Sequence, residues 1–336
     1  MWSTMAKKAQ ASLKSGLSMP HVLCLGWKLG VLVSIVLCVL TFLRIQQYHQ
    51  ATGSYSSAHL PRKSRVLSYQ FSGDLKIAFM FLVRKNLPLD FLWGSFFENV
   101  DKAKFSIYIH SEPGFVFDES NTRSAFFFNR QLNNSIKVAW GEASMIEAER
   151  VLFEEALQDP ANQRFILLSD SYIYKYLMDS PRSFVDSFFD KKDVRYNPKM
   201  SPVIHRNKWR KGSQWVTLIR RHAEVVVDDE TVFPLFRKYC KRRPPIDPSS
   251  GRKNLKLQKQ HNCIPDEHYV QTLLAMNDLE PELERRTVTY TSWNQSVANT
   301  KNEAWHPFKF SYSDSGPQQI KRIRVYSLHF ALLLQE

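Results

Sequence analysis

The chain has 336 residues, of which 43% are hydrophobic and 13% aromatic, enough for one large α/β domain or two modest ones. It holds only 11 glycines and neither G-x-G-x-x-G nor G-x-x-x-x-G-K-[ST], which excludes the glycine-built phosphate loops of dinucleotide enzymes and P-loop NTPases. The formal net charge of +14 indicates an anionic partner or surface. Nucleic acid is not the expected partner, because no helix-turn-helix, zinc-finger or RRM-type signature occurs.

An apolar run from His21 to Leu43 has the length of one bilayer-spanning helix, and its single charge, Lys28, lies near its N-terminal end. No small-residue cleavage site follows the run, so we expect an uncleaved transmembrane signal-anchor. Residues 1–20 would form a cytosolic tail, residues 44–73 a stem rich in Ser, Gln and Arg, and the luminal domain would begin at residue 74.

Gly26 and Gly30 in this run form a G-x-x-x-G pair, a pattern of dimerising membrane helices. A homodimer or a heterodimer is therefore a further expectation. Two N-glycosylation sequons, at Asn133 and Asn294, agree with a luminal position for the rest of the chain.

Cys240 and Cys263 are the only cysteines outside the apolar run, and in an oxidising lumen they could form a disulfide. Such a bridge would close a basic loop, stabilise the fold by roughly 3 kcal/mol, and hold the chain just before Glu267. Two unpaired thiols are the alternative.

Strand-like and helix-like segments alternate from residue 76 onward. Buried strands are expected at Lys76–Val83, Phe105–His110, Lys137–Trp140 and Phe165–Asp170. Helices are expected at 89–100 and 143–159, the second with Met145, Ala148, Val151, Leu152 and Ala156 on its apolar face. This alternation predicts an α/β domain with a mostly parallel sheet and helices on both faces, where ligands bind beyond the carboxyl ends of the strands.

The stretch Pro265-Asp266-Glu267 precedes an apolar run in which Val270, Leu273 and Leu274 share one helix face. Proline suits a first helical turn, and acidic residues there complement the helix dipole. Taken alone, the stretch is an acidic helix start.

Several motifs resemble, in order, those of the core-2/I-branching β-1,6-N-acetylglucosaminyltransferase family in its plant, brittle-culm-type branch. They are "KIAFMFLVRKNLPLDFLWGSFF", "FSIYIHSEPG", "VAWGEASMIEAERVL", "FILLSDS", "SPRSFVDSF", "RYNPKMSP", "WRKGSQWVTL" and "CIPDEHYVQTLL". The similarity covers roughly residues 74–319, and a tail, an anchor and a stem ahead of the domain is the layout of such Golgi enzymes.

The resemblance implies a GT-A-like fold with a nucleotide-binding sheet and a type II membrane protein of the Golgi. It implies inverting transfer from a UDP-sugar, GlcNAc or another, to a glycan hydroxyl, without a metal or other cofactor. The family's P-D-E stretch carries the catalytic base, which is Glu267 here. A carboxylate within hydrogen-bond reach can accept the proton of a sugar hydroxyl as it attacks.

Other roles follow from the same resemblance. Asp266 would cap a helix or orient the acceptor, and Glu112, after a strand, would bind the base or ribose of the nucleotide. The cleft would be lined by Arg210, Lys211, Gly212, Ser213 and Trp215. A sugar ring would stack on Trp215, Trp293 or Trp305, for which ordinary core packing is the alternative. Asp228-Asp229-Glu230 could mimic a metal-binding D-x-D motif, but we expect a solvated turn.

Two departures from the family pattern bear on activity. Ser171 runs directly into Tyr172, where the family has a short loop beside the donor site. The tail at 320–336 does not resemble the family segment whose Arg and Lys neutralise the leaving diphosphate; Lys321, Arg322 and Arg324 are the candidate replacements. We therefore expect reduced or absent activity, and the alternative function is a non-catalytic type II membrane protein that retains a glycan or nucleotide-sugar cleft.

Overall fold

The computed structural model describes most of the chain after residue 70. The described residues are 33–34, 36–37, 39–41, 71–169, 180–190, 195–243, 262–289, 316–318 and 321. The chain divides into two compact units, Met1–Lys63 and Ser64–Glu336. Within the described residues, no helix has the length and apolar character needed to cross a membrane, and the expected signal-anchor lies largely outside them.

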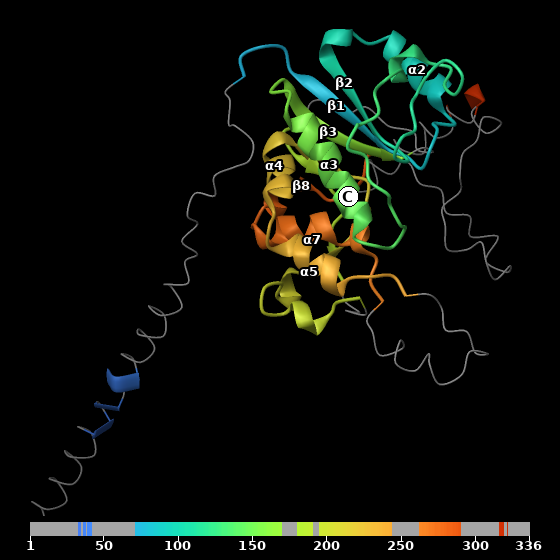
Figure 1. Ribbon diagram of the computed structural model, residues 1–336. Helices are drawn as coiled ribbons and strands as arrows, with labels where there is room; N and C mark the ends of the chain where they lie inside the picture. Colours follow the sequence, from blue (N-terminus) through green and yellow to red (C-terminus); the bar gives the residue numbers. More distant parts are fainter. Residues whose placement is uncertain are drawn as a thin grey trace, which may run out of the picture. The chain divides into compact units, whose positions relative to one another are not determined.

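The second unit is built on a six-stranded sheet with the order β2-β1-β3-β7-β4-β8 (Figure 1). Its strands are β1 (Lys76–Leu82), β2 (Phe105–His110), β3 (Asn162–Ser169), β4 (Ser183–Phe184), β7 (Thr217–Ile219) and β8 (Leu283–Glu284). β1 is parallel to both β2 and β3, β7 is antiparallel to β3 and β4, and β4 is parallel to β8. The half that contains the first three strands is therefore parallel, as expected, and antiparallel pairing begins beyond β3.

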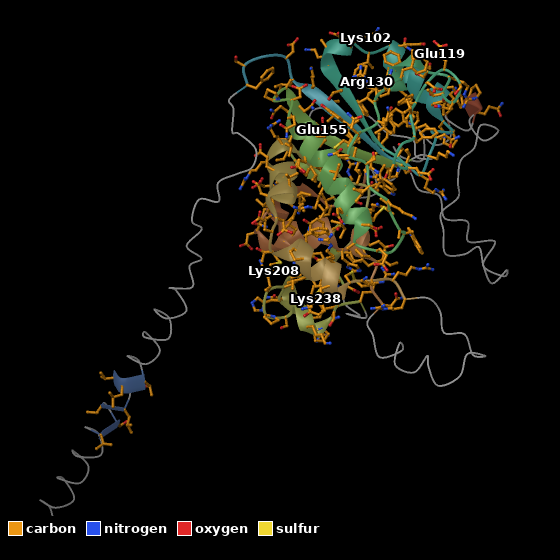
Figure 2. All side chains as sticks on the ribbon, in the orientation of Figure 1. Lys102, Glu119, Arg130, Glu155, Lys208 and Lys238 are labelled. Atoms are coloured by element: carbon orange, nitrogen blue, oxygen red, sulfur yellow. A yellow bond between two sulfur atoms is a disulfide. The ribbon has the colours of Figure 1, made fainter. Side chains whose placement is uncertain are left out.

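Alternation along β1 produces two apolar cores, one on each face of the sheet. Phe79 and Phe81 pack with Trp93 and Phe97 of α2 (Asp90–Glu98), and the Phe79 and Phe97 rings meet edge to face at 5.2 Å. Met80, on the opposite face, packs in the core that contains α3 (Ser144–Leu157). Side chains fill the space between the sheet and its helices (Figure 2).

The expected strand at Lys137–Trp140 is wrong, because this segment pairs with no strand of the part of the chain that the structure describes. The nearby backbone amides bond to side chains instead: Ile136 N–H donates to His110 Nε2 and Ala139 N–H to Ser144 Oγ, both at 3.0 Å. Beside β2, only an isolated bridge joins Ile109 to Gln131 among the described residues. A run of four apolar and polar residues was too short to distinguish a strand from extended coil.

The helix expected at 143–159 is confirmed as α3, but its buried stripe differs from the expected one. Met145 and Val151 are only half-buried, whereas Ile146, Glu149 and Phe153 are fully buried. The helix packs against the sheet and also against α4 (Arg220–Asp228), which widens the covered surface. The buried Glu149 carboxyl lies beside Gln214 and Asp266.

The remaining elements surround this framework. They are α5 (Val232–Tyr239), α7 (Tyr269–Met276), the pair β5 (Phe188–Phe189) and β6 (Arg210–Lys211), and the 3₁₀ turns η1 (Lys102–Lys104), η2 (Ala125–Phe127), η3 (Pro198–Met200), η4 (Arg206–Lys208), η6 (Pro265–Glu267) and η7 (Glu280–Glu282).

The expectation of a solvated turn at Asp228-Asp229-Glu230 is wrong for its central residue. Asp229 is 2% exposed and accepts hydrogen bonds from the backbone N–H groups of Thr231, Val232 and Phe233 at the start of α5. It also accepts a hydrogen bond of 3.0 Å from the hydroxyl of Tyr269 on α7. The carboxylate is therefore a buried helix cap that joins two helices.

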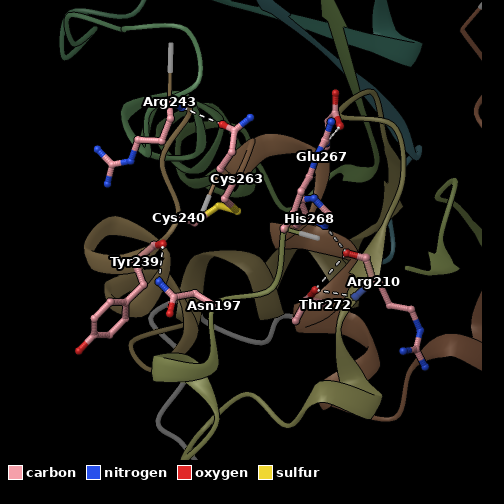
Figure 3. Close-up of a disulfide and its surroundings, with 11 residues drawn as sticks. Asn197, Arg210, Tyr239, Cys240, Arg243, Cys263, Glu267, His268 and Thr272 are labelled. Carbon is pink, nitrogen blue, oxygen red and sulfur yellow. Dashed lines mark hydrogen bonds and ion pairs between the residues drawn. A yellow bond between two sulfur atoms is a disulfide. The ribbon is translucent and has the colours of Figure 1, made fainter. Parts of the chain in front are cut away.

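A disulfide joins Cys240, at the end of α5, to Cys263, just before η6 (Figure 3). Their Cα atoms are 4.9 Å apart, and the bridge closes a separation of 23 residues. The two ends of the enclosed segment are also joined by hydrogen bonds, from Cys263 N–H to Lys241 O at 3.0 Å and from Arg243 N–H to Asn262 Oδ1 at 2.7 Å.

We predict that the double variant Cys240→Ala/Cys263→Ala lowers the free energy of unfolding by roughly 3 kcal/mol, because the unfolded chain gains the entropy of an open loop of this length. Chemical denaturation under oxidising conditions measures the change. Reduction of the unaltered protein should produce a similar loss, and equal stability of the oxidised and reduced proteins would contradict the prediction.

Candidate active site

The acidic turn η6 lies directly against β6. Gly212 N–H donates to the carbonyl of Glu267 at 2.9 Å, and the Nδ1–H of His268 donates to the carbonyl of Arg210 at 2.7 Å (Figure 3). Burial lowers the pKa of His268 to about 3, so its ring is neutral, and it stacks on Trp209 with ring centroids 4.5 Å apart. These contacts fix the backbone on which the Glu267 side chain is mounted.

Only glycine fits at position 212. A Cβ atom there would lie 1.5 Å from the carbonyl oxygen of Asp186. Three segments, those of Asp186, Gly212 and Glu267, therefore meet with their backbones in close approach.

The carboxylate of Glu267 forms ion pairs with two cations. Its Oε2 contacts Arg195, and Lys211 Nζ lies 3.9 Å away. The side chain is 32% exposed, so a substrate hydroxyl has access to it. A reachable carboxylate held in a defined place is the arrangement that general-base chemistry requires.

Two further carboxyl groups lie below this surface. Burial, assisted by the charge of Glu267, raises the pKa of Asp266 to about 7, and Asp266 Oδ1 has no hydrogen-bond partner among the described residues. Burial raises the pKa of Glu149 on α3 well above its usual range, and the charge of Asp266 adds to the effect. Gln214 Nε2 donates to Glu149 Oε1 at 2.7 Å. Burial thus gives these two carboxyl groups a higher affinity for protons than an exposed carboxyl group has.

Asp186 is a site residue that the sequence reasoning missed. Burial raises the pKa of its carboxyl, while the backbone N–H of Ser213 and the charge of Lys211 act in the opposite direction. The group therefore lies beside Lys211 and Ser213. A lone acid between Val185 and Ser187 carries no sequence signal, because its neighbours come from a segment more than twenty residues away.

The side chains of Arg210 and Lys211 point to opposite faces of β6, because successive side chains alternate along a strand. Lys211 is directed toward Glu267, whereas Arg210 forms a two-pronged ion pair with Glu280, with Nε–Oε1 and Nη2–Oε2 distances of 2.8 Å. The guanidinium of Arg210 is thus engaged in holding η7 to β6.

The other predicted residues are placed as follows. Trp215 is half-buried. Its backbone N–H donates to Ser213 Oγ at 3.2 Å, and its backbone carbonyl accepts a hydrogen bond from Thr287 Oγ1 at 3.1 Å. Asn133 lies in an exposed turn. Trp293, Asn294 and Trp305 lie outside the described residues, as do Arg322 and Arg324.

Glu112 is exposed just beyond the carboxyl end of β2, and its N–H donates to Arg84 O at 3.1 Å in the loop after β1. Beside it, His110 and Ser111 are buried, and His110 Nδ1 and Ser111 Oγ have no hydrogen-bond partners among the described residues. Burial lowers the pKa of His110 to about 4, so its ring is neutral. This edge of the parallel strands is the usual ligand position in such sheets.

Comparison with known proteins identifies the family. The family model described as Core-2/I-Branching enzyme matches residues 77–324. The chain belongs to the Core-2/I-branching enzyme family. A relative, Glycosyltransferase BC10 of Oryza sativa subsp. japonica, is 52% identical over 271 residues, which cover 75% of this chain and 66% of that protein. The match thus spans just under two thirds of that relative's length.

The resemblance stated from the motifs is confirmed by this membership. The α/β architecture with its mostly parallel central sheet fits the GT-A-like fold expected of the Core-2/I-branching family. Within the described residues, no three His, Cys, Asp or Glu side chains are grouped in a way that could hold a metal ion.

We predict that Asp266→Asn stabilises the protein at pH 8 but not at pH 4. The folded state binds the Asp266 proton more tightly than the unfolded state, so the contribution of this group to stability is full below about pH 4 and is lost as the pH rises through about 7. Asparagine does not titrate, so the free energy of unfolding of the variant should exceed that of the unaltered protein by on the order of 4 kcal/mol at pH 8. Unfolding curves across this pH range test it; parallel curves for the two proteins would contradict it.

Proposed function

We propose that the chain is an inverting glycosyltransferase that moves a sugar from a UDP-sugar, GlcNAc or another, onto a glycan hydroxyl, with Glu267 as the base. The observation that carries the proposal is the position of Glu267. Its carboxylate is partly exposed, and its backbone carbonyl accepts a hydrogen bond from Gly212 N–H. The chain that carries it belongs to the Core-2/I-branching family. The name of the rice relative, a glycosyltransferase, supports the same reaction class.

In this reaction the acceptor oxygen attacks the anomeric carbon while its proton passes to a carboxylate oxygen of Glu267. The bond between that carbon and the UDP oxygen breaks, and UDP leaves with the electron pair. One base and one displacement invert the anomeric centre, and no sugar-enzyme intermediate forms. Asp266 and Glu149 are buried and Glu267 is partly exposed, so Glu267 is the carboxylate that can accept the proton of a substrate hydroxyl.

The acceptor side of the site is the region around β6. Lys211 lies 3.9 Å from the Glu267 carboxylate, and Asp186 and Ser213 lie beside Lys211. These side chains offer donors and acceptors suited to sugar hydroxyls. We assign the nucleotide to the carboxyl ends of β1–β3, where Glu112 would bind the base or ribose.

We further propose that fixed cations, and not a metal, balance the charge on the departing diphosphate. Removing comparable stabilisation costs roughly 2.7–4 kcal/mol per donor in enzymes that rely on it. Lys321, Arg322 and Arg324 are the candidate cations in this chain.

The proposed location is the Golgi lumen, in a single-pass type II protein. Support comes from the apolar run at His21–Leu43, from the sequon at Asn133 in an exposed turn, and from the disulfide, which forms in oxidising compartments.

A second candidate function is a non-catalytic membrane protein that keeps the sugar-binding cleft. The direct junction of Ser171 with Tyr172, without the family's loop beside the donor site, favours it. Binding of a UDP-sugar without release of UDP, by folded protein, would support this function over transfer.

We predict that Glu267→Gln lowers the rate of UDP release from UDP-sugars, in the presence of EDTA, by a factor of roughly 10² or more, because the amide cannot accept the proton. Steady-state assays of the purified full-length protein with an acceptor panel measure the rate.

The matched control is Glu280→Gln, which alters a carboxylate paired with the neighbouring residue of β6, Arg210, on the other side of the strand. It should reduce stability and leave the rate per folded molecule within a few-fold of the unaltered protein. Equal rate losses in both variants would show that Glu267 has a structural role only.

A further inference from the structure

Two exposed phenylalanines lie on the strand next to β6. Phe188 and Phe189 form β5 and are 46% and 43% exposed. β5 pairs antiparallel with β6, with Phe188 opposite Lys211 and Phe189 opposite Arg210. Exposed aromatic side chains of this size incur a cost in water, and here two of them adjoin the candidate active site.

Successive side chains of a strand point to opposite faces of the sheet, so the rings of Phe188 and Phe189 lie on opposite faces. Each ring shares its face with the residue directly opposite it in β6. Arg210 confirms this for Phe189: its guanidinium lies over that ring, 5.8 Å from the centroid. Phe188 shares the other face with Lys211, whose Nζ is 3.9 Å from the Glu267 carboxylate. Asp186, two residues before Phe188, also lies beside Lys211.

We propose that Phe188 is an acceptor-binding residue, on whose ring a neutral sugar of the glycan acceptor stacks beside Glu267; this inference rests on the proposed transferase function. The face of an aromatic ring is electron-rich and attracts the polarised C–H groups that line one face of a hexose. Asp186 and Lys211 on the same face supply hydrogen-bond partners for the hydroxyl groups around the ring edge.

The geometry favours the acceptor over the donor as the occupant. A nucleotide diphosphate is anionic and is expected at the carboxyl ends of β1–β3, whereas an uncharged aromatic ring suits an uncharged sugar. The acceptor hydroxyl must also come within about 3.2 Å of the base, and Phe188 shares its face with the lysine that contacts that base.

The test compares Phe188→Ala with its neighbour Phe189→Ala, an equally exposed aromatic on the opposite face. Oligosaccharides of galactose, xylose and N-acetylglucosamine are titrated into the full-length protein without donor, and binding is followed by saturation-transfer NMR and calorimetry. We expect Phe188→Ala to raise the acceptor Kd, and the acceptor KM where turnover occurs, roughly tenfold or more, with Phe189→Ala within twofold of the unaltered protein. Thermal unfolding midpoints should be similar for both variants, because both side chains are exposed.

The outcomes separate this inference from the proposed function. Glycan binding that depends on Phe188, without UDP release, would uphold the acceptor-binding role of Phe188 and refute the transferase function. UDP release with equal acceptor KM values for both variants would uphold the transferase function and overturn the role of Phe188. Absence of binding for every oligosaccharide, or a change confined to the KM of the UDP-sugar, would also overturn it.

Discussion

The candidate site depends on the close approach of three backbone segments at Gly212. Its N–H holds the carbonyl of Glu267, and the space that a side chain would need is occupied by the carbonyl of Asp186. A larger residue would force β5, β6 and the acidic turn apart and would move the carboxylate away from Lys211. The glycine therefore allows residues from three distant parts of the sequence to converge on one surface.

The acidic turn is anchored from its other side as well. The disulfide between Cys240 and Cys263 ties the chain just before the turn to α5. Just after the turn, Tyr269 bonds through its hydroxyl to Asp229, while Arg150 of α3 donates to the same hydroxyl at 2.7 Å. Covalent and polar restraints thus flank Glu267 closely, which suits the proposed role as a base held in position before substrate binds.

Burial assigns different properties to residues of the same type. Asp266 and Glu149 are buried and hold protons more tightly than exposed carboxyl groups, whereas Glu267 reaches the surface between two cations. The alternation of side chains along β6 likewise gives its two basic residues different partners. Lys211 lies near Glu267 in the site, and Arg210 forms an ion pair with Glu280.

Local pattern was sufficient for the elements that are long and strongly periodic. β1, β2, α3 and β3 lie where apolar spacing places them, and the family motifs are confirmed by the family match. The prediction of a bridge between Cys240 and Cys263 needed only the exclusion of the two cysteines in the apolar run at His21–Leu43. Lys137–Trp140 failed because side chains took its backbone hydrogen bonds, which no periodicity reveals.

Non-local contacts account for what the sequence did not show. Asp229 is a buried cap that accepts a hydrogen bond from Tyr269, forty residues away. Glu149 is buried beside Gln214 and Asp266, which come from segments far along the chain. Asp186 reaches the site because the tertiary structure brings it beside Lys211, Gly212 and Ser213. The positions of these three carboxyl groups depend on the assembled tertiary structure, so residue spacing along the chain does not predict them.

The central claim, that Glu267 accepts the proton of the acceptor hydroxyl, is tested most directly by a crystal structure of the protein with UDP and a bound acceptor oligosaccharide. We expect one acceptor hydroxyl within about 3.2 Å of a Glu267 carboxylate oxygen, on the face shared with Lys211. An acceptor bound with its hydroxyl groups distant from Glu267, while the Arg195 and Lys211 ion pairs remain closed over the carboxylate, would contradict it.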